Sequence, residues 1–91
     1  MNWFRLDLGD AVLAQPRVDA IARRAKEAFE AASRPAGWAV YLAHVSGELH
    51  CRAEVLFSPA AAALARELGA VPCAEPGERP SLLAGRADPD D

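Results

Sequence analysis

Residues 38–57, WAVYLAHVSGELHCRAEVLF, decide the fold because they predict a β-hairpin. Two apolar-rich strands flank the turn-forming Ser46-Gly47. With these two residues as the turn, one face of the hairpin collects almost only apolar side chains and the other collects mixed ones. A shift of the pairing by one residue would place Arg52 and Glu54 in the core, at a high cost in free energy. The sequence therefore predicts which face of the hairpin is buried.

The segment before the hairpin predicts a strand and then a helix. Residues 3–8, WFRLDL, alternate between apolar and polar side chains, as a half-buried strand does. Asp10 follows this strand, and its carboxylate can cap the next turn of the chain. From Pro16 onward, apolar residues recur three or four positions apart, which is typical of an amphipathic helix. Lys26 and Glu30 lie four residues apart on that helix, a spacing that predicts an ion pair.

The segment after the hairpin predicts a second helix and one more strand. Ser58 is expected to be the N-cap of a helix over residues 60–68, which Gly69 ends. Residues 70–74 can form a short strand. Pro72 confines that strand to a sheet edge, because proline has no backbone N–H to donate to a second neighbour. The predicted order of elements is therefore β-α-β-β-α-β.

This order predicts an α+β fold of the ferredoxin-like type. Its two layers are a four-stranded antiparallel sheet, in the order 4-1-3-2, and two helices on one face of that sheet. The chain has 91 residues, which is the size of one domain. We expect this domain to cover residues 1–75. Residues 76–91 are expected to be a largely disordered acidic tail that contains Pro and Gly, with a docked turn at residues 81–84.

Charge and hydropathy exclude several kinds of partner. The net charge is −3, and Asp88, Asp90 and Asp91 account for the whole acidic excess. The neutral remainder is poorly suited to binding nucleic acid, which depends on neutralising phosphates. No apolar run is long enough to span a bilayer, and no basic amphipathic helix is present. The N-terminus carries charges where a signal peptide needs apolar residues. We therefore expect a cytoplasmic protein with no nucleic-acid or membrane partner.

The sheet face opposite the helices is the first candidate site. Aromatic and arginine side chains are enriched at the centres of protein interfaces. We therefore expect self-association as a homodimer through this face, or binding of an unidentified protein partner. The alternatives are a stacking platform for single-stranded RNA and a solvated face on which Arg52 and Glu54 are ordinary cross-strand partners. The residues expected at this interface are Trp3, Arg5, Tyr41, His50 and Arg52.

A small-molecule or metal site is the alternative function. His44 and Cys51 are expected on adjacent strands of the apolar face, diagonally related and within reach of each other. Cys73 can join them only if the fourth strand lies close. A zinc site needs three or four ligands, and here only two are placed. A Cys–His pair can also form an activated nucleophile, but a helix is expected to cover Cys51.

No catalytic site is predicted, and no cofactor. The sequence contains no GxGxxG, P-loop, GxSxG or HExxH motif. Asp7, Asp10 and Glu54 are the carboxylates nearest the sheet, and they form no constellation of base, orienting group and oxyanion donor. The leading interpretation is a small interaction module that is not itself an enzyme, with its biological role otherwise unknown.

Overall fold

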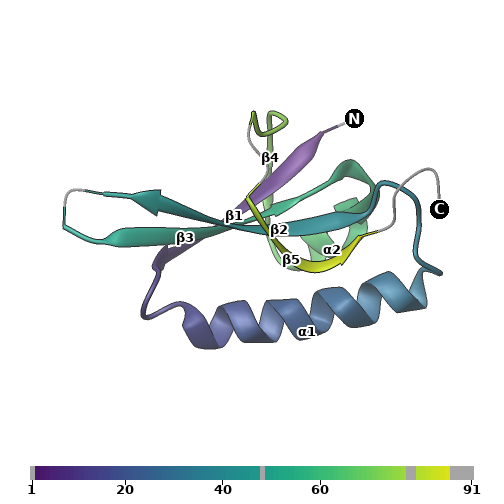
Figure 1. Ribbon diagram of the computed structural model, residues 1–91. Coiled ribbons are helices and arrows are strands. Elements are labelled where there is room, and N and C mark those ends of the chain that lie inside the picture. The colour runs from purple at the N-terminus through teal and green to yellow at the C-terminus, as the bar shows by residue number, and fades with distance from the viewer. Residues whose placement is uncertain (1, 48, 78–79, 87–91) are drawn as a thin grey trace.

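A computed structural model describes residues 2–47, 49–77 and 80–86. The chain forms one antiparallel sheet in the strand order β4-β1-β3-β2-β5. Two helices pack against one face of this sheet, and the long helix α1 lies along the direction of β2 and β3 (Figure 1). In chain order, the elements are β1 (Trp3–Asp10), α1 (Gln15–Ala31), β2 (Ala39–Ser46), β3 (Cys51–Phe57), the 3-10 turn η1 (Pro59–Ala61), α2 (Ala62–Glu67), β4 (Val71–Cys73) and β5 (Ser81–Arg86).

The predicted α+β class, with one antiparallel sheet and two helices, is confirmed, but the four-stranded ferredoxin-like arrangement is wrong. The sheet has a fifth strand, β5, which pairs with β2. The predicted turn at residues 81–84 is part of this strand, so the sheet extends past the expected domain end at residue 75. β5 forms a strand because it pairs with β2, some 40 residues earlier in the chain, and no local sequence pattern predicts such a contact. Residues 87–91 of the predicted tail lie outside the described residues.

The hairpin differs from the prediction in its loop but not in its faces. Ser46 pairs with Cys51, so the loop has four residues instead of two. The Gly47 N–H donates to the His50 carbonyl over 3.0 Å, and a Cβ on Gly47 would lie only 2.8 Å from that oxygen. The longer loop moves the pairing by four residues, so that Val40 lies opposite Phe57. Because four is an even number, every side chain keeps its predicted face.

The main core lies between the helices and the predicted apolar face of the hairpin. Val40, Val55 and Phe57 are its largest fully buried side chains. The Phe29 ring of α1 packs against Trp38, with ring centroids 5.0 Å apart. The remaining buried members come from β1, β3, both helices and the turns: Phe4, Leu8, Ala14, Val18, Ile21, Ala25, Ala53, Ala61, Leu64 and Ala65. This core fixes α1 beneath the sheet and thereby sets the position of its solvent-facing side.

Two predicted caps have different outcomes. The Asp10 carboxylate accepts hydrogen bonds from the N–H groups of Val12 and Leu13, over 2.9 and 3.1 Å, so the predicted cap is confirmed. Ser58 makes no side-chain cap, so that prediction is wrong. Its buried hydroxyl accepts instead from the Ala39 N–H over 2.9 Å. A backbone donor at the start of β2 would otherwise be buried without a partner, which costs more than a missing helix cap.

The opposite sheet face carries a second buried cluster. Trp3 and Tyr41 stack with ring centroids 6.1 Å apart, and they pack with Ala39 and Leu56. β4 and β5 lie at opposite edges of the sheet, so the link between them has to cross it. Figure 1 shows the described part of this link on the side of the sheet away from α1. The face that the sequence predicts to be open is therefore partly covered.

Candidate functional site

The structure separates the residues predicted to form an interface. The expected exposure of Trp3 and Tyr41 is wrong, because only 8% and 3% of their surfaces are accessible. Both rings fill the second cluster, where apolar area is removed from water. Arg5 and Arg52 are exposed on the same face, and His50 lies in the hairpin loop. The two aromatic residues that suggested an interface thus stabilise the fold.

The polar half of this face contains cross-strand ion pairs. Arg52 donates to the Asp7 carboxylate over 2.7 Å, and Arg5 lies 3.9 Å from Glu54. Arg52 and Glu54 therefore each pair with a side chain of the neighbouring strand β1, which is the cross-strand pairing that the solvated-face alternative predicts. The Gly9 N–H and then Arg52 hold the pKa of Asp7 below its usual value. Asp7 is thus a carboxylate at neutral pH, and its role here is structural.

The three candidate metal ligands do not come together. His44 and Cys51 lie on adjacent strands in a diagonal relation, but His44 is exposed near the hairpin end. Cys73 lies on β4, beyond β1 and β3 from His44, and packs against the second cluster. Burial raises the pKa of the Cys73 thiol, which disfavours the thiolate that a metal or a nucleophilic reaction needs. The described residues contain no group of three His, Cys, Asp or Glu placed to hold a metal ion.

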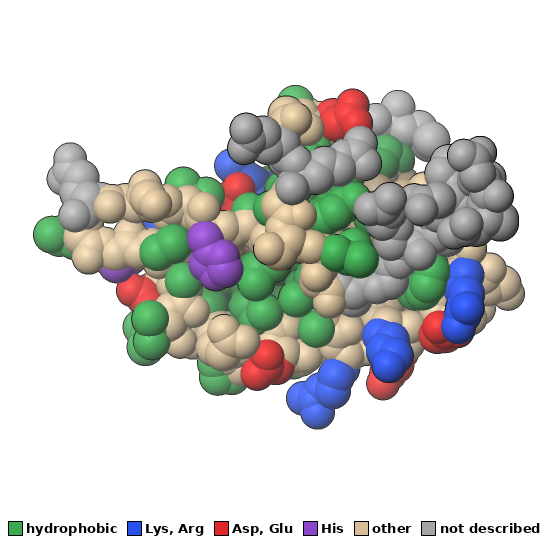
Figure 2. Space-filling view, viewed as in Figure 1, with side chains coloured by type: hydrophobic (Ala, Val, Ile, Leu, Met, Phe, Trp, Pro, Cys, Tyr) green, Lys and Arg blue, Asp and Glu red, His purple; other side chains and the backbone are tan. Residues whose placement is uncertain are grey.

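The strongest candidate site is a groove between α1 and β5 that the sequence does not predict. Its volume is about 370 Å³. Figure 2 shows basic and acidic side chains gathered along the exposed side of α1. The groove is lined by Ala22, Arg23, Lys26, Phe29, Glu30, Arg34 and Leu83. We call this set the helix groove.

The floor of the helix groove is apolar. Leu83 reaches it from β5 and packs against the main core, half-buried. Ala22 and Phe29 contribute from α1, and only 7% of the Phe29 surface is accessible. Because Phe29 is held by Trp38, this part of the floor is fixed before any ligand arrives. An apolar ligand body therefore meets a preformed surface.

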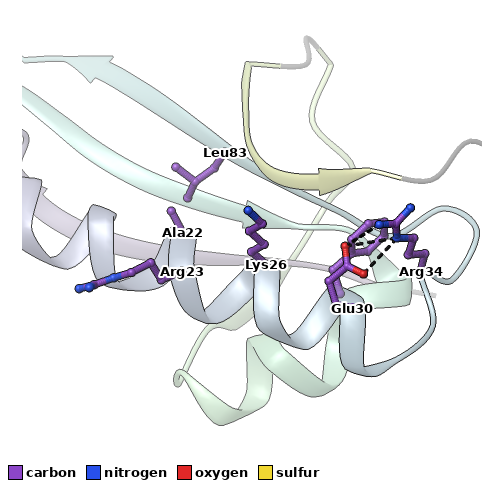
Figure 3. Close-up of a pocket in the computed structure, with 7 residues that line it drawn as sticks. Ala22, Arg23, Lys26, Glu30, Arg34 and Leu83 are labelled. Atoms are coloured by element: carbon purple, nitrogen blue, oxygen red, sulfur yellow. Dashed lines mark hydrogen bonds and ion pairs between the residues drawn. The ribbon is translucent and has the colours of Figure 1, made fainter.

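The rim of the helix groove has two cations, Arg23 and Lys26, that make no ion pair with any described residue, and Figure 3 shows the Arg23 guanidinium pointing away from the groove along α1. The Arg34 guanidinium donates to both oxygens of Glu30, over 3.0 to 3.2 Å. Ser33 and Arg34 have positive φ values of 63° and 53°, which turn the chain back toward the end of α1. The predicted Lys26–Glu30 ion pair does not form, and Lys26 has no hydrogen bond or ion pair with any described residue. Its ammonium group extends from α1 toward β5, between Leu83 and the Arg34–Glu30 pair (Figure 3).

A second hollow is smaller, and among its described lining residues no cation is without a contact. It has a volume of about 180 Å³ and lies beside η1, α2 and the start of β1. Its one basic side chain, Arg66, lies over the Phe4 ring at 5.8 Å from the centroid. This cation–π contact occupies the guanidinium. The helix groove is therefore the better ligand site.

Comparisons with known proteins add no homologue to this description. No family model, no curated protein and no solved structure matches the chain. Neither helix in the described part of the chain has the length and the apolar character that crossing a lipid bilayer requires.

Sequence reasoning misses the helix groove for two reasons. One wall is Leu83, which belongs to the unpredicted strand β5. The other reason is that Lys26 and Arg34 both lie four residues from Glu30, so the spacing alone does not tell which of them forms the ion pair and which stays free. A guanidinium matches a carboxylate with two parallel hydrogen bonds, which an ammonium group cannot do. That difference is the sequence signal that favours Arg34 as the partner and leaves Lys26 free.

Proposed function

We propose that this protein is a binding module for small organic anions and that the helix groove is its binding site. One observation carries the proposal: an ammonium group without a partner among the described residues stands over a preformed apolar floor. Lys26 supplies the charge, while Phe29 and Leu83 supply the floor. This location supports the small-molecule alternative, since the groove lies between a helix and the sheet. It does not involve His44 or Cys51.

The shape and charge of the groove restrict the class of ligand. A volume of about 370 Å³ is near the lower end of the range for small-molecule sites, about 300 to 1,000 Å³. Glu30 is neutralised by Arg34, so it does not repel an anion beside Lys26. The groove therefore suits one carboxylate or sulfonate joined to an apolar body about the size of one or two aromatic rings.

The fluorescent probe 1-anilinonaphthalene-8-sulfonate has this chemistry and tests the proposal. Saturable binding is expected to the full-length protein. Lys26→Gln is expected to weaken it about tenfold, because loss of one charge-assisted contact in a partly exposed site costs about 1.4 kcal/mol. Leu83→Ala is also expected to weaken binding, because it removes part of the apolar floor of the groove. The matched control is Arg17→Gln, which removes an exposed cation of α1 that does not line the groove.

The control separates a specific site from general attraction to a basic helix. Equal loss of affinity in Lys26→Gln and Arg17→Gln would show that the probe senses only the charge of α1. Unchanged affinity in Lys26→Gln would contradict the proposal directly. Circular dichroism of each variant establishes that the fold is intact, which is expected because both side chains are exposed.

A cytoplasmic location is part of the same proposal. Its support is that Cys51 and Cys73 are both free thiols, on different strands and at different places in the sheet. Reduced thiols are usual in the cytoplasm. Fractionation of cells that produce the untagged chain tests this, and recovery outside the cytoplasmic fraction would contradict it.

A further inference from the structure

The distal half of β2 is an open strand edge. β5 pairs with β2 only as far as Leu42, which lies opposite Ser81. Residues 43–46 continue the strand and pair with β3 on their other side. Among the described residues, no strand pairs with their outward edge. Figure 1 shows this part of the β2–β3 hairpin projecting beyond β5 and the rest of the sheet.

This edge lacks the features by which sheet edges normally avoid pairing. The opposite edge strand, β4, has only three residues, and Pro72 removes one of its donors. Residues 43–47 are Ala, His, Val, Ser and Gly, with neither Pro nor a Lys, Arg, Asp or Glu side chain. Charges, prolines and short length are the usual protection against edge-to-edge association. An uncharged edge can meet a copy of itself without repulsion between like charges.

We propose that residues 43–47 of two copies pair antiparallel, forming a homodimer with one continuous sheet. This inference is independent of the helix groove. A two-fold axis perpendicular to the sheet keeps each side chain on its own face, so each residue faces one an even number of positions away. An axis at His44 places Ser46 opposite Leu42, which Ser81 already occupies. An axis at Val45 avoids this conflict and pairs Val45 with Val45 of the second copy.

The exposed apolar side chains of this edge fit the same register. Val45, Leu49 and Leu82 are 45%, 93% and 49% exposed, so association along this edge can remove their apolar surface from water. With the axis at Val45, the hairpin loop of one copy reaches the start of β5 in the other. Leu49 then lies beside Leu82 of the second copy, and the symmetry repeats this contact. The two Val45 side chains form a β-branched cross-strand pair at the centre.

Sedimentation equilibrium of the full-length protein from micromolar to millimolar concentration tests this surface. A dimer is expected for the wild type. Val45→Lys is expected to weaken it by about a hundredfold or more, because two ammonium groups meet at the axis. Val71→Lys is the matched control, since Val71 is a similarly exposed valine at the opposite edge of the sheet, and its dimer is expected to be unchanged. A monomeric wild type overturns the proposal, as does a Val45→Lys dimer of unchanged affinity.

Cysteine cross-linking tests the register. Val45→Cys is expected to form a covalent dimer on mild oxidation, because the two Val45 positions are directly opposite. Ser46→Cys is expected to give no more cross-linked dimer than the wild type, whose Cys51 and Cys73 provide the baseline. Preferential cross-linking through Ser46→Cys would overturn the axis at Val45.

Discussion

The helix face and the opposite face of the sheet both bury aromatic side chains, but different parts of the chain cover them. The helix face packs Phe57, Phe29 and Trp38 beneath two helices. The opposite face buries Trp3 and Tyr41 without any helix. On this second face, the link between β4 and β5 accompanies the buried rings, while the rest of the face carries the two ion pairs and the exposed Val45.

This difference shows what alternation along a strand can predict. Alternation assigns each side chain to one side of the sheet, because successive residues of a strand point in opposite directions. It does not state what lies above that side. Helix periodicity indicates a cover for the helix face, whereas no periodic pattern marks the link over the second face. Tyr41 therefore has the predicted direction but not the predicted exposure.

The largest effect is expected in the helix-face core. Phe57→Ala is expected to lower the free energy of unfolding by about 4 kcal/mol, because it removes a fully buried ring and leaves a cavity. Urea unfolding followed by circular dichroism measures the change. Val12→Ala provides the control, since Val12 is 83% exposed and its loss is expected to stay within about 0.5 kcal/mol.

A somewhat smaller effect is expected on the second face. Tyr41→Ala is expected to cost about 3 kcal/mol, since Tyr41 is 3% exposed but belongs to a smaller cluster. The double variant with Trp3→Ala is expected to show a coupling of about 1 kcal/mol from the stacked pair. If this face were open to solvent, each single substitution would lower the free energy of unfolding by less than about 0.5 kcal/mol. That result would contradict the burial of Trp3 and Tyr41.

The smallest effect on stability is expected from two ion pairs, one on each side of the sheet, as the pH falls. On the helix side, Arg24 of α1 donates to both oxygens of Glu67 on α2, each over 2.8 Å. Arg24 lowers the pKa of Glu67, and the Gly9 N–H followed by Arg52 lowers that of Asp7. A lowered pKa in the folded state stabilises the fold above the ordinary carboxyl range, and this stability is lost as the pH falls through that range and below it.

Thermal unfolding between about pH 6 and pH 2 measures these contributions. The midpoint is expected to fall as the pH drops past the ordinary pKa values of 4.5 for Glu67 and 3.8 for Asp7. Arg24→Gln is expected to flatten this dependence more than Arg52→Gln, because a backbone N–H also holds Asp7. The opposite ranking would show that Arg52 is the main partner of Asp7.

The parts of the fold that sequence reasoning predicts are those fixed by local pattern. The buried hairpin face, the long helix and the Asp10 cap each follow from residues close together in the chain. β5 and the four-residue hairpin loop depend on non-local pairing and loop geometry, so they are missed. The same limit applies to the helix groove: Leu83 and Lys26 are 57 positions apart, and only β5 brings them to one site.

The most direct test of the helix groove is nuclear magnetic resonance of the Lys26 side chain. Lys26 is the only lysine in the sequence, so selective labelling gives one side-chain signal without ambiguity. Titration with 1-anilinonaphthalene-8-sulfonate is expected to shift this signal saturably, together with the Leu83 methyl signals. Shifts confined to Val12, Leu13 and Leu49, with Lys26 and Leu83 unmoved, would show that the probe only coats exposed apolar side chains, and would contradict the proposed site.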